Sequence, residues 1–376
     1  MYSLSRRTFL AASAAVAASP ALAASKTRLG LVHSTHRRLA RPASPEAELD
    51  YEQVRDMVWQ AIGYGRPRAN SLEAKIKPGC WVVLKPNIVS LRPRRGYRTG
   101  DITDMRVLKA VLEYVATHSK AKRITIAEGG SYRNLHDPET TAVIIQDGRR
   151  VNAVTFDWGD QEWNGFSGSM GGMIDEAAHR FPEKAFDYVD LAYDAIREPD
   201  GKFRRIEVPR ASNGIGAFSS QASYYVTHTI TECDFLITIP VLKVHNQCGI
   251  TCCLKNYVGT APRIAYARDG GFSNNLLHQE HSVDYRIDPF ITDLAAFHPP
   301  DYAVIDGIRG LQYSEHNIGK PDQMIRSNLI VAGEDSIAAD ALAAHLIGWS
   351  RRCRRRPRAT APLLGQTPQL VRPRQP

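Results

Sequence analysis

The sequence has little cysteine and no long hydrophobic run, and both absences exclude classes of protein. Six cysteines in 376 residues are too few for a small fold held together by disulfides. The chain contains no Cys-x-x-Cys-x-x-Cys-x-x-x-Cys run, so no ferredoxin-type cluster is expected. The apolar stretch at 9–18 is too short and too rich in alanine to span a bilayer well, and no stable membrane span is expected.

The body of the chain also lacks an excess of charge. The formal net charge is +9, but residues 1–23 and 351–376 hold ten arginines and no acidic residue. Without those ten, the basic residues fall from 48 to 38, against 39 acidic residues. A near-neutral body gives no support for a nucleic-acid partner. The content of 43% hydrophobic and 23% charged residues is that of a globular protein with a real core and excludes a disordered chain.

Residues 1–23 have the features of an export signal. Paired arginines precede the apolar run, and the small residues Ala21 and Ala23 fit a signal-peptidase site. Segment 5–10, Ser-Arg-Arg-Thr-Phe-Leu, resembles the twin-arginine motif. We therefore expect the twin-arginine translocase as a partner during export, and a periplasmic or extracellular location. The alternative is an ordinary secretory signal in which the two arginines form its positively charged end.

Short apolar runs alternate with segments of helical periodicity along residues 24–350. The runs predict strands at 81–84, 123–127, 151–156, 203–208, 235–239, 302–305 and 329–332. The periodic segments predict helices at 46–64, 105–118, 137–148, 174–181, 184–196, 287–297 and 336–347. This alternation predicts an α/β domain with a mostly parallel sheet flanked by helices. The less regular region at about 158–225 is interpreted as an insertion.

Residues 351–376 differ from the rest in composition. They contain eight arginines, five prolines and no apolar periodicity, which predicts disorder. Our interpretation is a shifted reading frame, because arginine and proline dominate when GC-rich DNA is misread. The alternative is an arginine-rich tail that binds an anionic surface.

Polar residues follow the ends of several predicted strands. They are Lys85 with Asn87, Glu128, Asp157, Lys243 with His245, Asp306 and Asp335. In open parallel sheets, ligands bind at the edge formed by the carboxyl ends of the strands. The pattern therefore predicts a polar ligand site at that edge. The alternative is that loops after strands are polar in any protein.

Several motifs carry a resemblance to a known family. They are Lys-Pro-Asn at 85–87, Thr-Asp at 103–104, Ile-Ala-Glu-Gly at 126–129, Pro-x-x-Lys-x-His at 240–245, Thr251, Leu-Lys-Asn at 254–256, Gly259, Leu-His at 277–278, Ile-Asp-Gly at 305–307 and Asp340. Over residues 75–348 the chain resembles domain of unknown function 362, a prokaryotic family of uncharacterised proteins. The resemblance implies no established activity.

Lys85, Lys243 and Lys255 would bring up to three ammonium groups to one edge of the sheet. Such a cluster is costly unless an anion or carboxylates neutralise it. It therefore predicts a small anionic ligand, such as a carboxylate or phosphate, and a lysine of lowered pKa that acts as a base or Schiff-base nucleophile. The alternative is a buried network in which the lysines pair with carboxylates. The candidates for that pairing are Asp104, Glu128 and Asp306.

The remaining polar residues of these motifs are candidates for substrate binding and proton transfer. Asn87, Thr251 and Asn256 are predicted to bind the substrate, since their side chains can donate to an oxyanion. His245 is the candidate acid, base or ligand, and with Lys243 and Lys255 it forms the predicted catalytic set.

A divalent metal is a further hypothesis. His278 and His281 are spaced to lie on one helix face and to hold a metal, but no clear third ligand accompanies them. The residues predicted to balance charge or bind a metal are Asp104, Glu128, Asp306 and His278.

Three cysteines lie in the densest motif, at 248, 252 and 253. Beside Lys243 and Lys255, their thiols would have lowered pKa values and be reactive. Their spacing matches no standard zinc or cluster pattern, and small buried packing residues are the favoured interpretation. A redox or metal role is the alternative.

Two functions follow from these residues. The first is an enzyme that acts on a small anionic substrate. The second is a non-catalytic periplasmic ligand-binding or redox/iron–sulfur accessory protein, in which Lys243→Ala or His245→Ala would cost no turnover.

Overall fold

The computed structural model describes residues 27–68, 70–88, 100–129, 143–146, 149–152, 170–211, 214, 216–218, 221–245, 248–266, 287–313 and 322–348. The strands are β1 Leu29–His33, β2 Trp81–Pro86, β3 Arg123–Glu128, β4 Val143–Gln146, β5 Arg149–Asn152, β6 Ala185–Asp190, β7 Arg205–Glu207, β8 Ser223–Tyr225, β9 Phe235–Ile239, β10 Lys243–His245, β11 Gly249–Thr251, β12 Tyr302–Leu311 and β13 Met324–Gly333. The helices are α2 Tyr51–Tyr64, α3 Leu72–Lys75, α5 Met105–His118, α7 Met170–Arg180, α8 His228–Glu232, the 3₁₀ helix η2 Lys255–Thr260, α9 Arg263–Tyr266, α11 Asp288–Phe297 and α12 Ser336–Leu346.

One seven-stranded sheet organises the chain, in the order β1-β13-β12-β9-β2-β3-β6. The run from β12 to β6 is parallel throughout, whereas β13 is antiparallel to both of its neighbours. The predicted α/β class with a mostly parallel sheet is confirmed. β1, at one edge of the sheet, was not predicted from the sequence.

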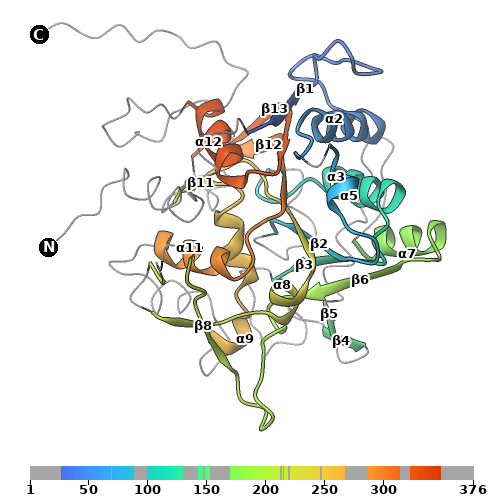
Figure 1. The fold of residues 1–376 in the computed structure, drawn as a ribbon. Coiled ribbons are helices and arrows are strands. Elements are labelled where there is room, and N and C mark those ends of the chain that lie inside the picture. Colours follow the sequence, from blue (N-terminus) through green and yellow to red (C-terminus); the bar gives the residue numbers. More distant parts are fainter. Residues whose placement is uncertain are drawn as a thin grey trace, which may run out of the picture.

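Helices cover both faces of this sheet. Figure 1 shows α2, α5 and α7 on one side, and α11 and α12 on the other. Successive side chains of β2 point alternately to the two faces of the sheet, as they do along any strand. Val82 and Leu84 pack into the core beneath α2 and α5, and Val83 packs into the core on the other face.

Local caps determine where two of the helices begin. The Asp50 carboxylate accepts the backbone N–H of Gln53 at 2.9 Å, and the Gln53 side chain accepts that of Asp50 at 3.1 Å. This capping box starts α2 at Tyr51, five residues after the predicted start. Asp104 caps α5 in the same way, through the backbone N–H of Arg106 at 2.9 Å. The backbone N–H of Asp104 in turn donates to Asp306 in the sheet, which holds the start of α5 beside the candidate site.

Two helix predictions are wrong. Segment 184–196 contains β6, which pairs with β3 from Arg123↔Ala185 to Glu128↔Asp190. Phe186 and Tyr188 pack on one face of the sheet and Val189 on the other, so sheet pairing outweighs the local helical pattern. Segment 137–148 contains β4, which pairs antiparallel with β5. Residues 147–148 are Asp-Gly, a hairpin-turn signal that favours the observed pairing over a helix.

The strand directions also correct the prediction of which residues lie at the ligand-binding edge of the sheet. Since β13 runs antiparallel to β12, Asp335 lies at the opposite edge of the sheet from Lys85 and Glu128. There it caps α12 by accepting the backbone N–H of Ala338 at 2.9 Å. Asp306 lies inside β12 rather than after it, level with the bridge to Val241 that follows β9. Asp157 lies outside the described residues.

Parts of the predicted insertion belong to the main fold. α7 and β6 both fall within 158–225, and β6 is a strand of the main sheet. The segment predicted to be an export signal, 1–23, and the tail at 351–376 lie outside the described residues. Within the part of the chain that the structure describes, no helix is both long and apolar enough to cross a membrane.

Candidate functional site

Lys85 lies at the end of β2, with its side chain only 1% exposed. Its ammonium group donates to a Glu128 carboxylate oxygen at 2.7 Å, to the Pro86 carbonyl at 2.7 Å and to Asn256 Oδ1 at 3.1 Å. An ammonium has three protons, so these three acceptors use its full donor capacity. The predicted pairing of a lysine with a carboxylate is therefore realised by Lys85 and Glu128.

Glu128 ends β3, the strand next to β2, and is also buried. The oxygen that accepts from Lys85 also accepts the backbone N–H of Ile88 at 2.8 Å. The other oxygen accepts the backbone N–H of Gly129 at 2.7 Å. The carboxylate joins the ends of β2 and β3.

A glycine is required above this ion pair. A Cβ atom at Gly259, in η2, would lie 2.5 Å from Glu128 Oε1 and 2.8 Å from Lys85 Nζ. No side chain fits at that distance, so η2 can approach the ion pair only because residue 259 is glycine. Gly259 was among the residues that carry the family resemblance.

Asn256 and Asn87 complete the cluster around Lys85. Asn256, also in η2, donates from its amide nitrogen to the Lys85 carbonyl at 2.9 Å and to Thr238 Oγ1 at 3.0 Å. Its oxygen accepts from Lys85 and, at 3.3 Å, from the side-chain nitrogen of Asn87. β2, β3 and β9 therefore contribute adjacent polar groups, and η2 lies across them.

Positive charge from two further side chains reaches this cluster. Lys255 is half-buried at the start of η2, and Arg263 is buried in α9. Burial lowers the pKa of Lys85; Glu128 opposes this shift, while Arg263 and Lys255 reinforce it. Among the described residues, Lys255 forms no ion pair with a carboxylate. The sequence predicted Lys255, whereas no feature of the sequence singled out Arg263.

Segment 101–104 connects this cluster to a second group of predicted residues. Thr103 Oγ1 accepts the backbone N–H of Asn87 at 2.8 Å and donates to the Ile239 carbonyl at 2.6 Å. The buried Lys243 ammonium donates to the carbonyl of Asp101. The backbone N–H of Asp104 donates to Asp306 at 2.7 Å. Segment 101–104 thus contacts Asn87, which follows β2, and residues of β9, β10 and β12.

Asp306 and Asp104 form a buried carboxyl pair beside Arg106. One oxygen of Asp306 accepts from Asp104 N, and the other accepts the backbone N–H of Ile308 at 2.9 Å. Burial, reinforced by the charge of Asp104, raises the pKa of Asp306 to about 7. Asp104 pairs with the guanidinium of Arg106 at 2.6 Å. Asp306 is therefore a carboxyl group that titrates near neutral pH.

Lys243, His245 and Thr251 lie on the β10–β11 hairpin. Lys243 pairs with Thr251 in the ladder, and His245 pairs with Gly249. His245 is 5% exposed, and its Nδ1 faces the backbone N–H of Cys248 at 3.3 Å. An acceptor role for Nδ1 leaves the proton of a neutral imidazole on Nε2. Among the described residues, the buried hydroxyl of Thr251 finds no hydrogen-bond partner.

Two of the three cysteines of this motif, Cys252 and Cys253, do not have the predicted low pKa values. Cys252 and Cys253 are fully buried; burial raises the pKa of Cys252 to about 11 and that of Cys253 well above its usual value. The backbone N–H of Cys253 donates to Asp340 at 2.7 Å. The prediction is wrong because burial removes both thiols from water, and their charged neighbour is the Asp340 carboxylate, which also raises their pKa values. For these two residues, the interpretation as packing residues agrees with their burial.

The metal hypothesis gains no support from the described residues. Among them, no three His, Cys, Asp or Glu side chains lie close enough together to hold a metal ion. Asp104, Glu128 and Asp306 bind backbone N–H groups and cations of the chain instead. His278 and His281 lie outside the described residues.

Sequence reasoning missed Thr238, Arg106 and Arg263. Thr238 is the one polar residue within the apolar run 235–239, and this departure was an available signal. Arg106 follows the cap residue Asp104 by two positions, a spacing at which their side chains meet on the first helical turn. Arg263 offered no such signal.

These observations define an α/β protein with a buried polar cluster at the carboxyl ends of adjacent parallel strands. The family model of domain of unknown function 362 matches residues 193–345, and this match supports the resemblance found in the sequence. The motifs at 85–87, 103–104 and 126–129 lie before the matched segment. No curated protein matches the chain.

Two solved structures are similar to the chain at low identity. The lactate racemase apoprotein from Thermoanaerobacterium thermosaccharolyticum has a TM-score of 0.37 and 11% identity, covering 78% of this chain and 55% of its own. A protein from Thermotoga maritima has a TM-score of 0.36 and 11% identity, covering 80% of this chain and 59% of its own. The chain therefore spans little more than half of the length of either structure.

Proposed function

We propose that this chain is an enzyme that binds a small anionic substrate beside Lys255 and transfers a proton on it. The observation that carries the proposal is the half-buried Lys255, which forms no ion pair with a described carboxylate although Lys85 and Arg263 lie nearby. Grouped cations raise each other's electrostatic energy, and a bound anion offsets this cost. A carboxylate or phosphate group is the anion that suits an ammonium of this kind.

Lys85 and Lys255 have different roles in this proposal. Its three protons are engaged by Glu128, Asn256 and a carbonyl, so it holds the surrounding groups in place and does not contact the substrate. Lys255 supplies the charge that the substrate meets.

His245 is the residue proposed to move the proton. Its unperturbed pKa lies near neutral pH, where a general acid or base is most effective. It lies on the same hairpin as Lys243, whose ammonium contacts segment 101–104. Thr103 in that segment contacts Asn87, so the hairpin and the Lys85 cluster share one supporting segment.

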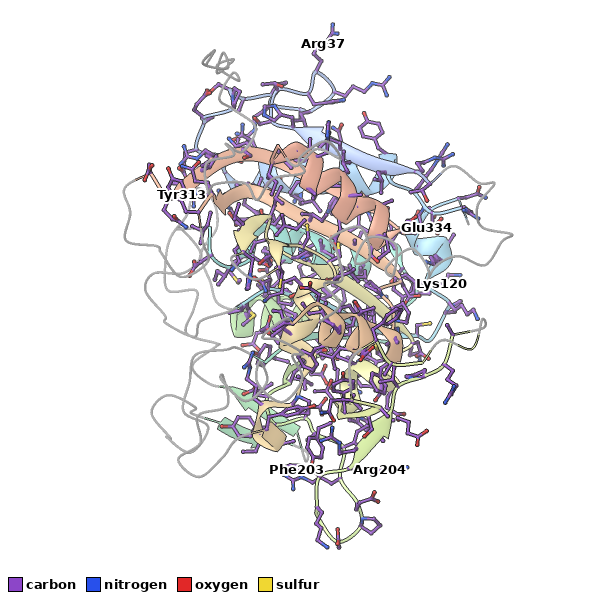
Figure 2. The ribbon with its side chains drawn as sticks, turned by 90° about the vertical axis from the view of Figure 1, so that its left-hand side faces the viewer. Arg37, Lys120, Phe203, Arg204, Tyr313 and Glu334 are labelled. Atoms are coloured by element: carbon purple, nitrogen blue, oxygen red, sulfur yellow. The ribbon has the colours of Figure 1, made fainter. Side chains whose placement is uncertain are left out.

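Binding is tested by calorimetry of the whole chain with inorganic phosphate, sulfate and acetate. The proposal predicts saturable binding of at least one of these anions, weakened about tenfold or more by Lys255→Gln. Lys120→Gln is the matched control, because Lys120 is an exposed lysine at the periphery of the molecule (Figure 2). Binding that is equal in both variants, or absent from the wild type, would contradict the proposed site.

Catalysis is tested by proton exchange on bound small anions. In D₂O, NMR would follow deuterium incorporation into carboxylate and phosphate-ester compounds that bind in the first experiment. The enzyme proposal expects incorporation that His245→Gln abolishes while binding persists. Binding without exchange in any compound would instead support a ligand-binding protein.

Export is a separate proposal that rests on residues 5–10. Replacing Arg6 and Arg7 by lysine should retain the chain in the cytoplasm of a bacterial host. Fractionation and immunoblotting would show this, and unchanged export would favour the general secretory route.

A further inference from the structure

The cluster around Lys85 determines the orientation of the Asn256 amide. Its nitrogen faces two acceptors, the Lys85 carbonyl and Thr238 Oγ1, while its oxygen faces the Lys85 ammonium. Reversing the amide would place a donor against the ammonium and an acceptor against the carbonyl. The oxygen of Asn256 therefore points towards Lys85 and Asn87.

This orientation determines that of Asn87 in turn. Its side-chain nitrogen must face the Asn256 oxygen, to which it donates at 3.3 Å. The side-chain oxygen of Asn87 then points away from Asn256, is buried and receives no hydrogen bond from the described residues. Asn87 as a whole is 8% exposed. An unmet buried acceptor is costly and rare in folded proteins, so a partner that supplies an O–H or N–H group is expected there.

We infer that the ligand is a small anion with a hydroxyl or amine close to its charged group. The hydroxyl or amine would donate to Asn87 Oδ1, and the charged group would bind Lys255. The two groups lie around the same amide: the charge of Lys255 acts on Lys85, and the oxygen of Asn256 accepts from both Lys85 and Asn87. This inference rests on the proposed function and narrows its substrate class, since a simple anion leaves Asn87 Oδ1 without a donor.

The test compares pairs of anions that differ only in the donor. Calorimetry on the whole chain would measure 2-hydroxyethyl phosphate against ethyl phosphate, and glycolate against acetate. In at least one pair, the hydroxylated member should bind about ten- to a hundredfold more tightly, the range expected when a buried acceptor gains its donor. Asn87→Leu keeps a similar side-chain volume and removes the acceptor, so it should abolish the preference while the simple anion still binds.

A second variant guards against misfolding of the first. Asn87→Asp keeps an acceptor at the same place and should preserve the preference for the hydroxylated member, although its added negative charge weakens both. Circular dichroism and thermal unfolding would confirm that each variant is folded.

The outcomes separate this inference from the proposed function. Equal binding of the hydroxylated and the simple anion by the wild type would overturn the inference. The partner of Asn87 Oδ1 would then be a water molecule, and the proposed anion site would still stand. A preference that survives Asn87→Leu would also overturn it, because another residue would then recognise the donor. Failure of every anion to bind would overturn both proposals.

Discussion

Replacing Glu128 by glutamine should destabilise the fold strongly, because it leaves the ammonium of Lys85 buried without its charge partner. The two side chains are 1% and 3% exposed, and the nitrogen and oxygen of the ion pair lie 2.7 Å apart. Removing one partner of such a pair costs about 3–5 kcal/mol of the free energy of unfolding. Glutamine has nearly the volume of glutamate, so the change removes charge and leaves packing nearly intact.

The loss should depend on pH in a defined direction. Burial lowers the pKa of Lys85, and Glu128 is the nearby charge that opposes this shift. In the variant, the folded lysine therefore loses its proton well below the pKa of about 10.4 of an unfolded lysine. Between these two pKa values the unfolded state binds one more proton. The free energy of unfolding of the variant should then rise by up to about 1.4 kcal/mol for each pH unit.

Urea unfolding followed by tryptophan fluorescence at several pH values would measure both effects. The double variant Lys85→Met, Glu128→Gln should be more stable than Glu128→Gln alone, since it buries no charge. Asp200→Asn is the control: it breaks an exposed ion pair with Lys202 and should leave the unfolding midpoint unchanged. A loss below about 1 kcal/mol, or a double variant no more stable than the single one, would refute the reasoning.

Two further changes test the same region. Asp306 has a folded pKa of about 7, raised by burial and by Asp104. In the unfolded chain its pKa is about 3.9. Between these two pKa values the unfolded state releases a proton that the folded state keeps. The free energy of unfolding therefore falls by up to about 1.4 kcal/mol for each pH unit as the pH rises. Asp306→Asn should remove this component, and parallel urea-unfolding profiles of the two proteins over that range would contradict the prediction. Gly259→Ala should cost about 1–3 kcal/mol in thermal or urea unfolding, because its Cβ would lie 2.5 Å from Glu128 Oε1. Gly63→Ala, with nothing within 4 Å, should be neutral or stabilising, and equal effects at the two glycines would contradict the steric argument.

The sequence predicted the central strands well, because short apolar runs with sharp ends are strong signals. The runs at 81–84, 123–127 and 235–239 correspond to β2, β3 and β9 within one or two residues. The edges of the sheet were harder to predict. β6 contains Asp187, Tyr188 and Asp190, and its pairing with β3 rather than its own composition makes it a strand.

The residues of the site could be predicted where the direction of their strands could be predicted. Lys85 and Glu128 lie at the carboxyl ends of neighbouring parallel strands. The rule that ligand sites form at this edge of a parallel sheet therefore predicted correctly that they lie together. The same rule misplaced Asp335, because a run of apolar residues does not reveal which way its strand points. The contacts of Asn87 with Asn256 join residues 169 positions apart and depend on the tertiary fold.

The arrangement at the sheet edge explains why two lysines of one motif set have different roles. Lys85 is surrounded by acceptors from Glu128, Pro86 and Asn256, so moving its ammonium would leave a buried carboxylate without its charge partner and remove one of the two donors to the Asn256 oxygen. It therefore holds the amide of Asn256 in one orientation, which in turn leaves the Asn87 oxygen without a donor. Lys255 forms no ion pair with a described carboxylate, and we propose that its charge meets the ligand. Rigid polar support beneath an available charge and an available acceptor is the arrangement that recognition of a small polar anion requires.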